Sequence, residues 1–217
     1  MILVNGFLQL RPGDIDGMRP ALYRQLTIAK QLDGCLHYAF AEDIEDSSRL
    51  RIAERWRDRA TQSAHMIGNH MAEFNIAMRT ASVSKGELDA YEDGMVRKIL
   101  EIPGARFRPE RAEMDMVIVM GTIRFVDGEF DRLMPEMIEQ VAITRSEDGC
   151  ELYAFARDIL DPEMLHIAER WRDQTALETH FTAPNTIAFS AALATAQIES
   201  INVNAYNATH ERVLMHR

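Results

Sequence analysis

The chain contains one long internal repeat, and this feature constrains its fold more than any other. When the 217-residue sequence is compared with itself at an offset of 115 residues, the two halves align without a gap. Between residues 34 and 65, eighteen of thirty-two positions are identical in the second half. Solenoid repeats are only about 20–50 residues long, so this repeat predicts a duplicated domain. We place the domains at residues 1–92 and 116–207, with a linker at 93–115 and a C-terminal tail at 208–217.

The strands of each copy are predicted from apolar, β-rich or alternating residues. These segments are residues 2–10, 35–41 and 50–56 in the first copy and 117–126, 150–156 and 165–171 in the second. A fourth strand is expected to end near Tyr91 in the first copy and near Tyr206 in the second. Each half therefore has four predicted strands.

Two helices are predicted between these strands. The apolar stripe of the first helix consists of Met18, Leu22, Leu26 and Ala29, which recur at three- and four-residue steps. Gly34 follows where the end of a helix needs a left-handed residue. Asp58 can cap the second helix, which Gly68 interrupts. In the second copy Gly149 and Asp173 occupy the positions of Gly34 and Asp58, and Pro184 interrupts the helix.

The resulting order, β-α-β-β-α-β, predicts an α+β fold made of two tandem ferredoxin-like domains. In this motif both helices cover the same face of a four-stranded antiparallel sheet, and the other face needs cover. We expect the two copies to supply that cover by packing sheet to sheet as a pseudo-dimeric α/β barrel, the single-chain analogue of a twofold dimer. The sequence leaves a further homodimer open.

Composition excludes several classes of partner. The formal net charge is −10, whereas nucleic acids and anionic membranes need a basic surface, so neither is expected as a partner. No apolar run approaches the roughly 20 residues of a membrane helix. The first residues lack the basic start and small-residue cleavage site of a signal peptide, so we expect a cytoplasmic location.

The two cysteines, Cys35 and Cys150, occupy the same position in each copy. One cysteine per domain inside a predicted strand is typical of a buried, reduced side chain rather than of a disulfide or a metal ligand. The sequence also has no phosphate loop, dinucleotide-binding glycine pattern or metal-ligand cluster. No metal or other cofactor is therefore expected.

Two motifs recur in both copies and carry a family resemblance. GCxxYAFAxDIxD begins at Gly34 and Gly149, and IAERWRD is followed by a histidine nine residues after its tryptophan. This pattern resembles the antibiotic biosynthesis monooxygenase family, and most of all the branch that contains quinol monooxygenases. The resemblance covers nearly all of each copy. It implies a dimeric ferredoxin-like barrel, here fused, with a pocket between each sheet and its helices.

The same resemblance implies a chemistry. Active members oxygenate phenolic or quinol substrates with O2 and need no metal or flavin. A haem-degrading branch of the superfamily uses an asparagine, a tryptophan and a histidine. Asn5 lies near the first of these positions, but the histidine position holds Phe74 or Phe189, so haem degradation is not expected.

His65 and His180 are the candidate catalytic residues. An imidazole titrates near neutral pH and can take the proton of a phenol, which makes the phenolate that donates an electron to O2. The alternative is that each histidine braces a helix against its sheet. Five further histidines lack a counterpart in the other copy and are predicted to lie at the surface. These are His37, His70, His166, His210 and His216.

Other repeated residues are candidates for binding a small aromatic substrate. They are Trp56, Trp171, Tyr38, Tyr153, Tyr91, Tyr206, Arg55 and Arg170, to which we add Asn5. An indole would form a wall against a flat ring, although packing in the core would also suit it. Glu54 and Arg55 lie on opposite faces of a strand, so we expect them, like Glu169 and Arg170, to form cross-strand or inter-copy salt bridges. An arginine that steadies a phenolate is the alternative.

Two functions are compatible with these observations. The first is a cofactor-independent monooxygenase that oxidises a quinol or phenolic aromatic with O2. The second is a non-catalytic barrel that binds a small ligand or serves a structural role. A third idea is that one copy is active and the other only completes the fold, because Asn5 is answered by Met120. Repeated residues alone do not separate these, because a duplicated core also retains its side chains.

Overall fold

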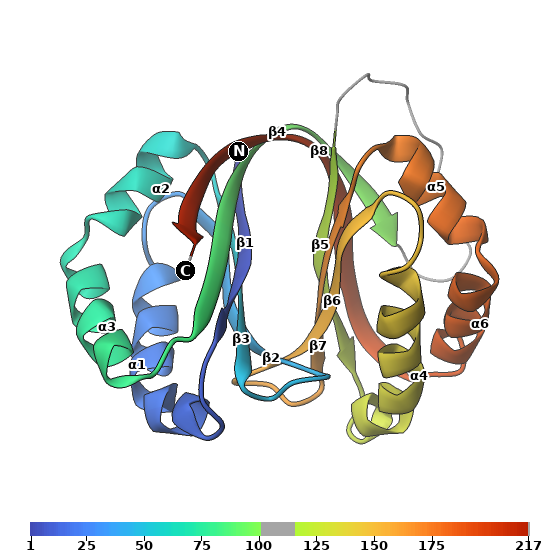
Figure 1. Cartoon of the computed structure of the whole chain (residues 1–217), viewed down its shortest axis with the longest axis horizontal. Helices are drawn as coiled ribbons and strands as arrows, with labels where there is room; N and C mark the ends of the chain where they lie inside the picture. Colours follow the sequence, from blue (N-terminus) through green and yellow to red (C-terminus); the bar gives the residue numbers. More distant parts are fainter. Residues whose placement is uncertain (101–115, 217) are drawn as a thin grey trace. The chain divides into compact units, whose positions relative to one another are not determined.

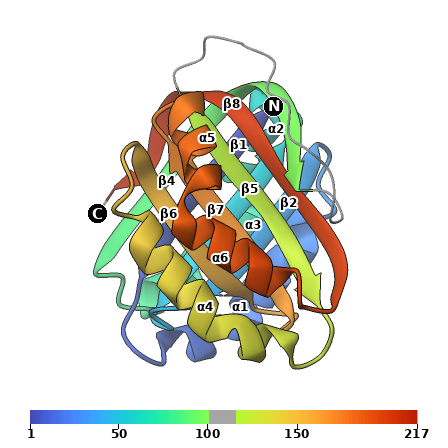
Figure 2. The same ribbon diagram turned by 90° about the vertical axis from the view of Figure 1, so that its right-hand side faces the viewer.

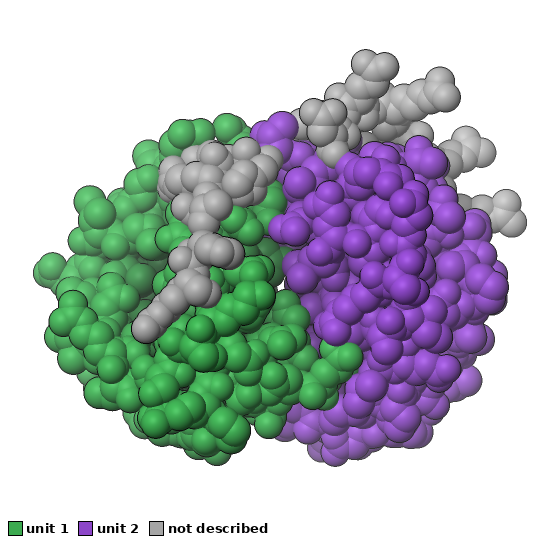
Figure 3. All heavy atoms as spheres, viewed as in Figure 1, with its two compact units in different colours: residues 1–93, 210–217 green, residues 94–209 purple. Residues whose placement is uncertain are grey.

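The computed structural model of the chain describes residues 1–100 and 116–216, and the side chains of residues 73, 93–100, 210–213 and 216 lie outside this description. The chain divides into two compact units. Unit 1 consists of Met1–Asp93 with His210–Arg217, and unit 2 consists of Gly94–Thr209 (Figure 3).

Unit 1 contains a four-stranded antiparallel sheet with its helices on one face (Figure 1). The strands pair in the order β4-β1-β3-β2. The elements are β1 (Ile2–Gln9), α1 (Asp14–Ala29), β2 (Cys35–Asp43), β3 (Arg49–Trp56), α2 (Arg59–Met66), α3 (Asn69–Thr80) and β4 (Lys85–Leu100).

Unit 2 repeats this arrangement, and Figure 2 shows α4, α5 and α6 lying over its sheet. The strands pair in the order β8-β5-β7-β6. The elements are β5 (Val117–Phe125), α4 (Glu129–Thr144), β6 (Cys150–Asp158), β7 (Met164–Trp171), α5 (Gln174–Thr182), α6 (Pro184–Leu193) and β8 (Ile198–His216).

The predicted α+β class with two tandem ferredoxin-like domains is confirmed. Each unit has the order β-α-β-β-α-β, with its second helical segment divided in two. The division falls at Gly68 in unit 1 and just before Pro184 in unit 2, as the sequence predicted. The packing of the two sheets against each other, and a further homodimer, stay predictions from the sequence. None of the helices in the described ranges has the length and apolarity of a membrane span.

The predicted features of the helices are also present. All four residues of the stripe on α1 are buried. Asp58 and Asp173 cap α2 and α5 by accepting hydrogen bonds from the backbone N–H groups of Thr61 and Ala176. Gly34 has a φ of 78°, but α1 already ends at Ala29. The left-handed residue therefore belongs to the turn that enters β2 rather than to the end of the helix.

The fourth strands are longer than the sequence predicted. Strand β4 continues past Tyr91 to Leu100, and β8 continues past Tyr206 to His216. The first part of the predicted linker and nearly all of the predicted tail are therefore strand. No proline, which cannot donate to a strand ladder, occurs in either extension, and the first one downstream is Pro103. The rest of the predicted linker, residues 101–115, lies outside the described residues.

Strands β1 and β4 approach closely at a glycine. A Cβ atom added at Gly6 would lie 2.0 Å from the backbone oxygen of Glu87. The equivalent atom at Gly121 would lie 2.2 Å from the backbone oxygen of Asn202 in unit 2. Only a residue without a side chain fits these positions, which lie on the helix-covered face of each sheet.

Candidate active site

The strand register divides the predicted site residues between the two faces of each sheet. In unit 1, Tyr38 pairs with Glu54 across β2 and β3, so both side chains point to the face that the helices cover. Trp56 lies two residues further along β3 and shares this face. Arg55 points to the opposite face because side chains alternate along a strand.

A compact aromatic cluster fills the space between the sheet of unit 1 and its helices. The ring of His65, on α2, stacks on the indole of Trp56 with centroids 4.6 Å apart and planes 28° apart. The ring of Tyr38 meets the same imidazole edge-on at 5.3 Å. His65 is only 2 % exposed, so the structure brings three of the predicted site residues together in the core.

Glu54 completes this cluster, and the salt bridge that the sequence predicted for it is wrong. Its carboxylate accepts a hydrogen bond of 2.7 Å from the indole Nε1 of Trp56, rather than forming the predicted salt bridge. Burial raises the pKa of this carboxyl to about 7, although hydrogen bonds from Trp56 and Tyr38 favour its ionised form. An indole satisfies a buried carboxyl without a second charge, which explains why the salt bridge is unnecessary.

Unit 2 reproduces the cluster. The imidazole of His180 lies 4.7 Å from the indole of Trp171 and 5.3 Å from the ring of Tyr153. The indole Nε1 donates a hydrogen bond of 2.8 Å to Glu169, and burial raises the pKa of that carboxyl to about 7 as well. The salt bridge predicted for Glu169 is therefore also wrong. Both copies thus bury a tyrosine, a glutamate, a tryptophan and a histidine, in this order along the chain.

The histidines differ between the copies in their polar partners. In unit 1, Nδ1 of His65 lies 3.0 Å from Nε2 of His70, so one proton joins the two rings. Nε2 of His65 is buried and has no hydrogen-bond partner among the described residues. Burial and the neighbouring His70 lower the pKa of His65 to about 4, which leaves its imidazole neutral at pH 7.

In unit 2, acidic and hydroxyl groups hold the histidine. Nδ1 of His180 lies 2.9 Å from a carboxylate oxygen of Glu147 and 3.2 Å from the hydroxyl of Thr186. Burial lowers the pKa of His180, and Glu147 opposes this shift. The corresponding positions of unit 1 hold Leu32 and Met71, which cannot provide these contacts. The two copies therefore share the cluster but not its surroundings.

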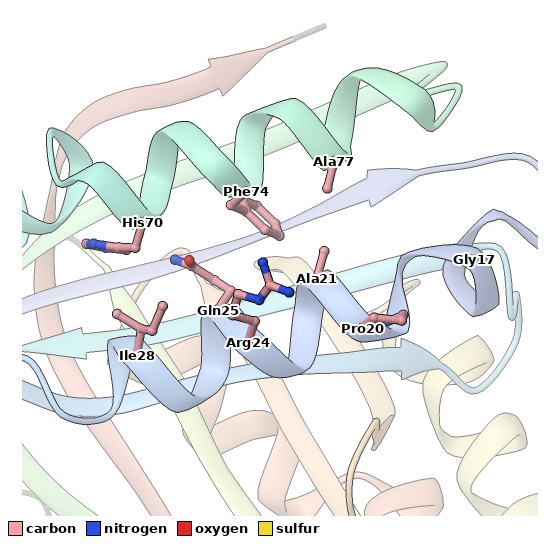
Figure 4. A pocket seen from close by; sticks show the side chains of 9 residues that line it. All are labelled: Gly17, Pro20, Ala21, Arg24, Gln25, Ile28, His70, Phe74 and Ala77. Carbon is pink, nitrogen blue, oxygen red and sulfur yellow. The ribbon is translucent and has the colours of Figure 1, made fainter.

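Each cluster lies behind a pocket between two helices. In unit 1 a pocket of about 230 Å³ separates α1 from α3 (Figure 4). Its lining consists of Gly17, Pro20, Ala21, Arg24, Gln25, Ile28, His70, Phe74 and Ala77. Two of these reach the cluster, because His70 contacts His65 and the amide of Gln25 donates a hydrogen bond of 3.4 Å to the hydroxyl of Tyr38.

These pockets lie between helices, whereas the resemblance implied a pocket between the sheet and the helices, which stays a prediction. Trp56, His65 and Tyr38 pack against one another in that layer of unit 1. The equivalent pocket of unit 2 lies between α4 and α6 and measures about 120 Å³. Neither His65 nor His180 is among the residues that line these two pockets.

The remaining predicted binding residues lie on the face away from the helices. Asn5 pairs with Ala53, and Tyr91 pairs with Leu3, which places both on the same side as Arg55. Asn5 is buried, and its amide nitrogen has no hydrogen-bond partner among the described residues. The structure therefore does not bring these three residues together with His65.

Tyr206 and Arg170 of unit 2 also lie on the face away from the helices. Both residues pair with Ile118 on β5, so their side chains point to the same side of the sheet. Arg170 forms the predicted cross-strand salt bridge, at 2.9 Å, with Glu151. The register thus separates these two side chains from His180.

Three of the histidines predicted at the surface are at least half-buried. His37 is half-buried on β2, His70 is half-buried against His65, and His166 is 6 % exposed and paired at 2.7 Å with Asp158. His166 occupies the position of Arg51, which makes the equivalent buried pair with Asp43, so both copies place a nitrogen donor beside this aspartate. The side chains of residues 210 and 216 lie outside the described residues.

Cys35 and Cys150 are unbonded and half-buried at the starts of β2 and β6. Burial raises the pKa of both thiols, that of Cys150 to about 12, which opposes a reactive thiolate. No group of three or more acidic, histidine or cysteine side chains within the described part of the chain is arranged to bind a metal ion.

Sequence reasoning missed three residues at this site. Gln25 was hidden within the helical stripe, although Gln140 repeats it at the same offset and both are buried. His70 was missed because the break at Gly68 changes the direction of the helix, so the spacing of five residues from His65 carries no signal. Arg24 has no repeated counterpart, since the second copy has a glutamate there.

Comparison with known proteins identifies the family. The model of the antibiotic biosynthesis monooxygenase family matches residues 1–77 and 116–192. A search of curated proteins found no match. Among solved structures, a protein of Lactobacillus acidophilus assigned provisionally as a monooxygenase is 14% identical over 99% of both chains, with a TM-score of 0.42.

A protein of Deinococcus radiodurans, assigned provisionally as an antibiotic biosynthesis monooxygenase, is 28% identical. The match covers 46% of this chain and 98% of that one, with a TM-score of 0.43. The two matched segments of the family model contain both aromatic clusters and both pockets. The chain belongs to the antibiotic biosynthesis monooxygenase family and has one domain of that family in each half.

Proposed function

We propose that this chain is a cofactor-independent monooxygenase that oxidises a quinol or phenolic aromatic with O2. Membership of a monooxygenase family supports the reaction class. The observation that carries the proposal is the link between pocket and cluster in unit 1, where His70 lines the pocket and contacts the buried imidazole of His65 at 3.0 Å. A phenol in this pocket has a proton acceptor at its wall and a second one behind it.

In the proposed reaction the substrate supplies all the electrons. His70 accepts the phenolic proton on its ring and passes the proton that it shares with His65 to that imidazole, so His65 is the final base. The phenolate then gives electrons to O2, and a new bond forms between oxygen and a ring carbon. A quinol loses two hydrogen atoms and gains one oxygen atom to become a hydroxyquinone. The second oxygen atom leaves as water with those two hydrogens, so four electrons move from the quinol to O2.

The protonation states suit this role. The lowered pKa of His65 keeps its imidazole unprotonated at neutral pH, so it is ready to accept rather than to donate a proton. A phenolate in the adjacent pocket would stabilise the imidazolium and raise this pKa toward neutrality. His180 occupies the equivalent position in unit 2 and is the second candidate base. Trp56 and Tyr38, with Trp171 and Tyr153 in unit 2, would hold these imidazoles in place.

Oxygen uptake tests the proposal. During aerobic incubation with a small panel of quinols, the chain is expected to make O2 disappear faster than it does with the same quinols in buffer alone. Anaerobic incubation is expected to leave the quinols unchanged. The double variant His65→Ala with His180→Ala should lower the rate by roughly a hundredfold, the usual contribution of a positioned base. Uptake that survives both substitutions would remove these histidines from the mechanism.

The second candidate function is non-catalytic binding of a small ligand. It is favoured by the position of His65 and His180, which are each 2 % exposed and stack on tryptophans rather than lining either of the two interhelical pockets. In that case quinols would bind to the pocket without any consumption of O2. The oxygen-uptake experiment therefore separates the two functions directly.

A further inference from the structure

The two interhelical pockets occupy equivalent positions but have different walls. They share a glutamine, an isoleucine and a phenylalanine at matching positions of the repeat. These are Gln25, Ile28 and Phe74 in unit 1 and Gln140, Ile143 and Phe189 in unit 2. The common part provides an apolar slot with an amide at its base. The differences between the pockets must therefore come from the other lining residues.

Those residues reverse the charge of the pocket. Arg24 lines the pocket of unit 1, and Glu139 takes its place in unit 2. Ala21 is likewise answered by Glu136. Figure 4 shows Arg24 on α1, on the side that faces Phe74. One pocket thus presents a guanidinium to its ligand, and the other presents two carboxylates, which repel anions.

Size separates the pockets as well. A buried apolar cavity of about 150 Å³ is large enough to bind benzene. The pocket of unit 1, at about 230 Å³, exceeds this volume and has room for a substituted ring. The pocket of unit 2, at about 120 Å³, is smaller.

The polar groups behind each pocket also differ between the two copies. In unit 2, Asn185 replaces His70 and donates a hydrogen bond of 2.9 Å to Glu147, which in turn holds His180. Asn185 also donates to the side chains of Gln140 and Thr144. This network ties the pocket wall to the buried histidine and satisfies it. In unit 1 the buried Nε2 of the histidine has no such partner among the described residues.

We propose that the two copies have specialised, and that only the pocket of unit 1 binds an anionic aromatic ligand such as a phenolate. The guanidinium of Arg24 provides charge complementarity, Phe74 provides a ring face, and His70 provides a hydrogen-bonding group. Unit 2 retains the fold and the buried cluster, but its acidic wall excludes anions. This inference deepens the proposed function by assigning it to one copy, and it concerns binding, which is measured separately from turnover.

Binding of para-nitrophenol to the full chain tests this assignment. The yellow anion and colourless acid of this probe report its ionisation, so absorbance shows whether the bound form is the phenolate. Para-nitroanisole has a similar shape without an ionisable hydroxyl and serves as the neutral control. Calorimetric titration of the wild-type chain is expected to give one equivalent of phenolate per chain. A stoichiometry of two, or no binding of the phenolate, would overturn the proposal.

A matched pair of variants locates the site. Arg24→Glu gives the first pocket the charge of the second, and Glu139→Arg makes the reciprocal change; both positions are exposed, so the fold should tolerate either. Arg24→Glu is expected to weaken phenolate binding roughly tenfold or more and to leave para-nitroanisole binding unchanged. Glu139→Arg should leave the affinity of the first pocket unchanged. Equal losses in both variants, or loss only in Glu139→Arg, would contradict the assignment.

The outcomes also separate this inference from the proposed function. Phenolate binding that depends on Arg24, together with no oxygen uptake from any quinol, would refute the monooxygenase proposal and leave the assignment of the ligand pocket intact. Oxygen uptake that is unaffected by Arg24→Glu would support the monooxygenase proposal and refute the assignment of the ligand pocket to unit 1.

Discussion

Replacement of Glu54 by glutamine should change how the stability of the chain depends on pH. Glutamine keeps the shape of the side chain and an oxygen that can accept the hydrogen bond from Trp56. It removes the buried carboxyl, whose pKa is about 7 in the folded chain and about 4.5 in a model peptide. The variant therefore lacks one titration that couples to folding.

The sign and size of the effect follow from these two pKa values. Below pH 4.5 the carboxyl is protonated in both states and contributes nothing to the pH dependence. Between pH 4.5 and 7 the unfolded chain ionises while the folded chain keeps its proton, so rising pH favours unfolding. Above this range the penalty is constant at roughly 3 kcal/mol, since each pKa unit corresponds to about 1.4 kcal/mol. The penalty is large because Glu54 is only 3 % exposed.

Urea unfolding of the wild type and Glu54→Gln at a series of pH values measures this effect. The free energy of unfolding of the variant minus that of the wild type should rise by about 3 kcal/mol between about pH 4 and about pH 8. Any constant cost of burying the amide cancels in this comparison. Glu169→Gln should behave in the same way. A difference that does not vary with pH would show that burial of the Glu54 carboxyl is not coupled to folding in this way.

Two glycine substitutions test close contacts of unit 1. Gly68→Ala would place a methyl group 2.4 Å from Cε1 of His70, so His70 should move away. The pKa of His65 should then rise from about 4, because the neighbouring His70 helps to lower it. A titration of His65 by nuclear magnetic resonance that finds no change would contradict the contact. Gly6→Ala would drive a methyl group into the backbone oxygen of Glu87, and we expect a loss of about 3 kcal/mol or more in urea unfolding. A loss below about 1 kcal/mol would show that β1 and β4 separate easily.

Much of the fold could be predicted because the repeat supplies two independent examples of each pattern. Asp58 and Asp173 both precede a helix, and both proved to be caps. The ends of the fourth strands could not be predicted, because Tyr91 and Tyr206 end the similarity between the copies without ending the strand. Similarity between copies marks a shared domain, whereas a strand ends where its hydrogen bonds end.

The site was predictable in part for a related reason. Strand alternation correctly placed Glu54 and Arg55 on opposite faces, but it cannot say that Trp56 donates a hydrogen bond to Glu54. The two residues were therefore assigned separate roles. The contact between His65 and His70 depends on a bend between two helices, which spacing does not encode. Repeated residues identified the buried cluster, and the unrepeated residues Arg24 and His70 turned out to line the pocket.

Isotopic labelling tests the central functional claim most directly. The wild-type chain would be incubated with a quinol under labelled O2, and the product and the water would be analysed by mass spectrometry. We expect a hydroxyquinone with one labelled oxygen atom and the second labelled atom in water. Quinone without label, with hydrogen peroxide as the reduced product, would show simple oxidation of the quinol and would contradict the assignment of this chain as a monooxygenase.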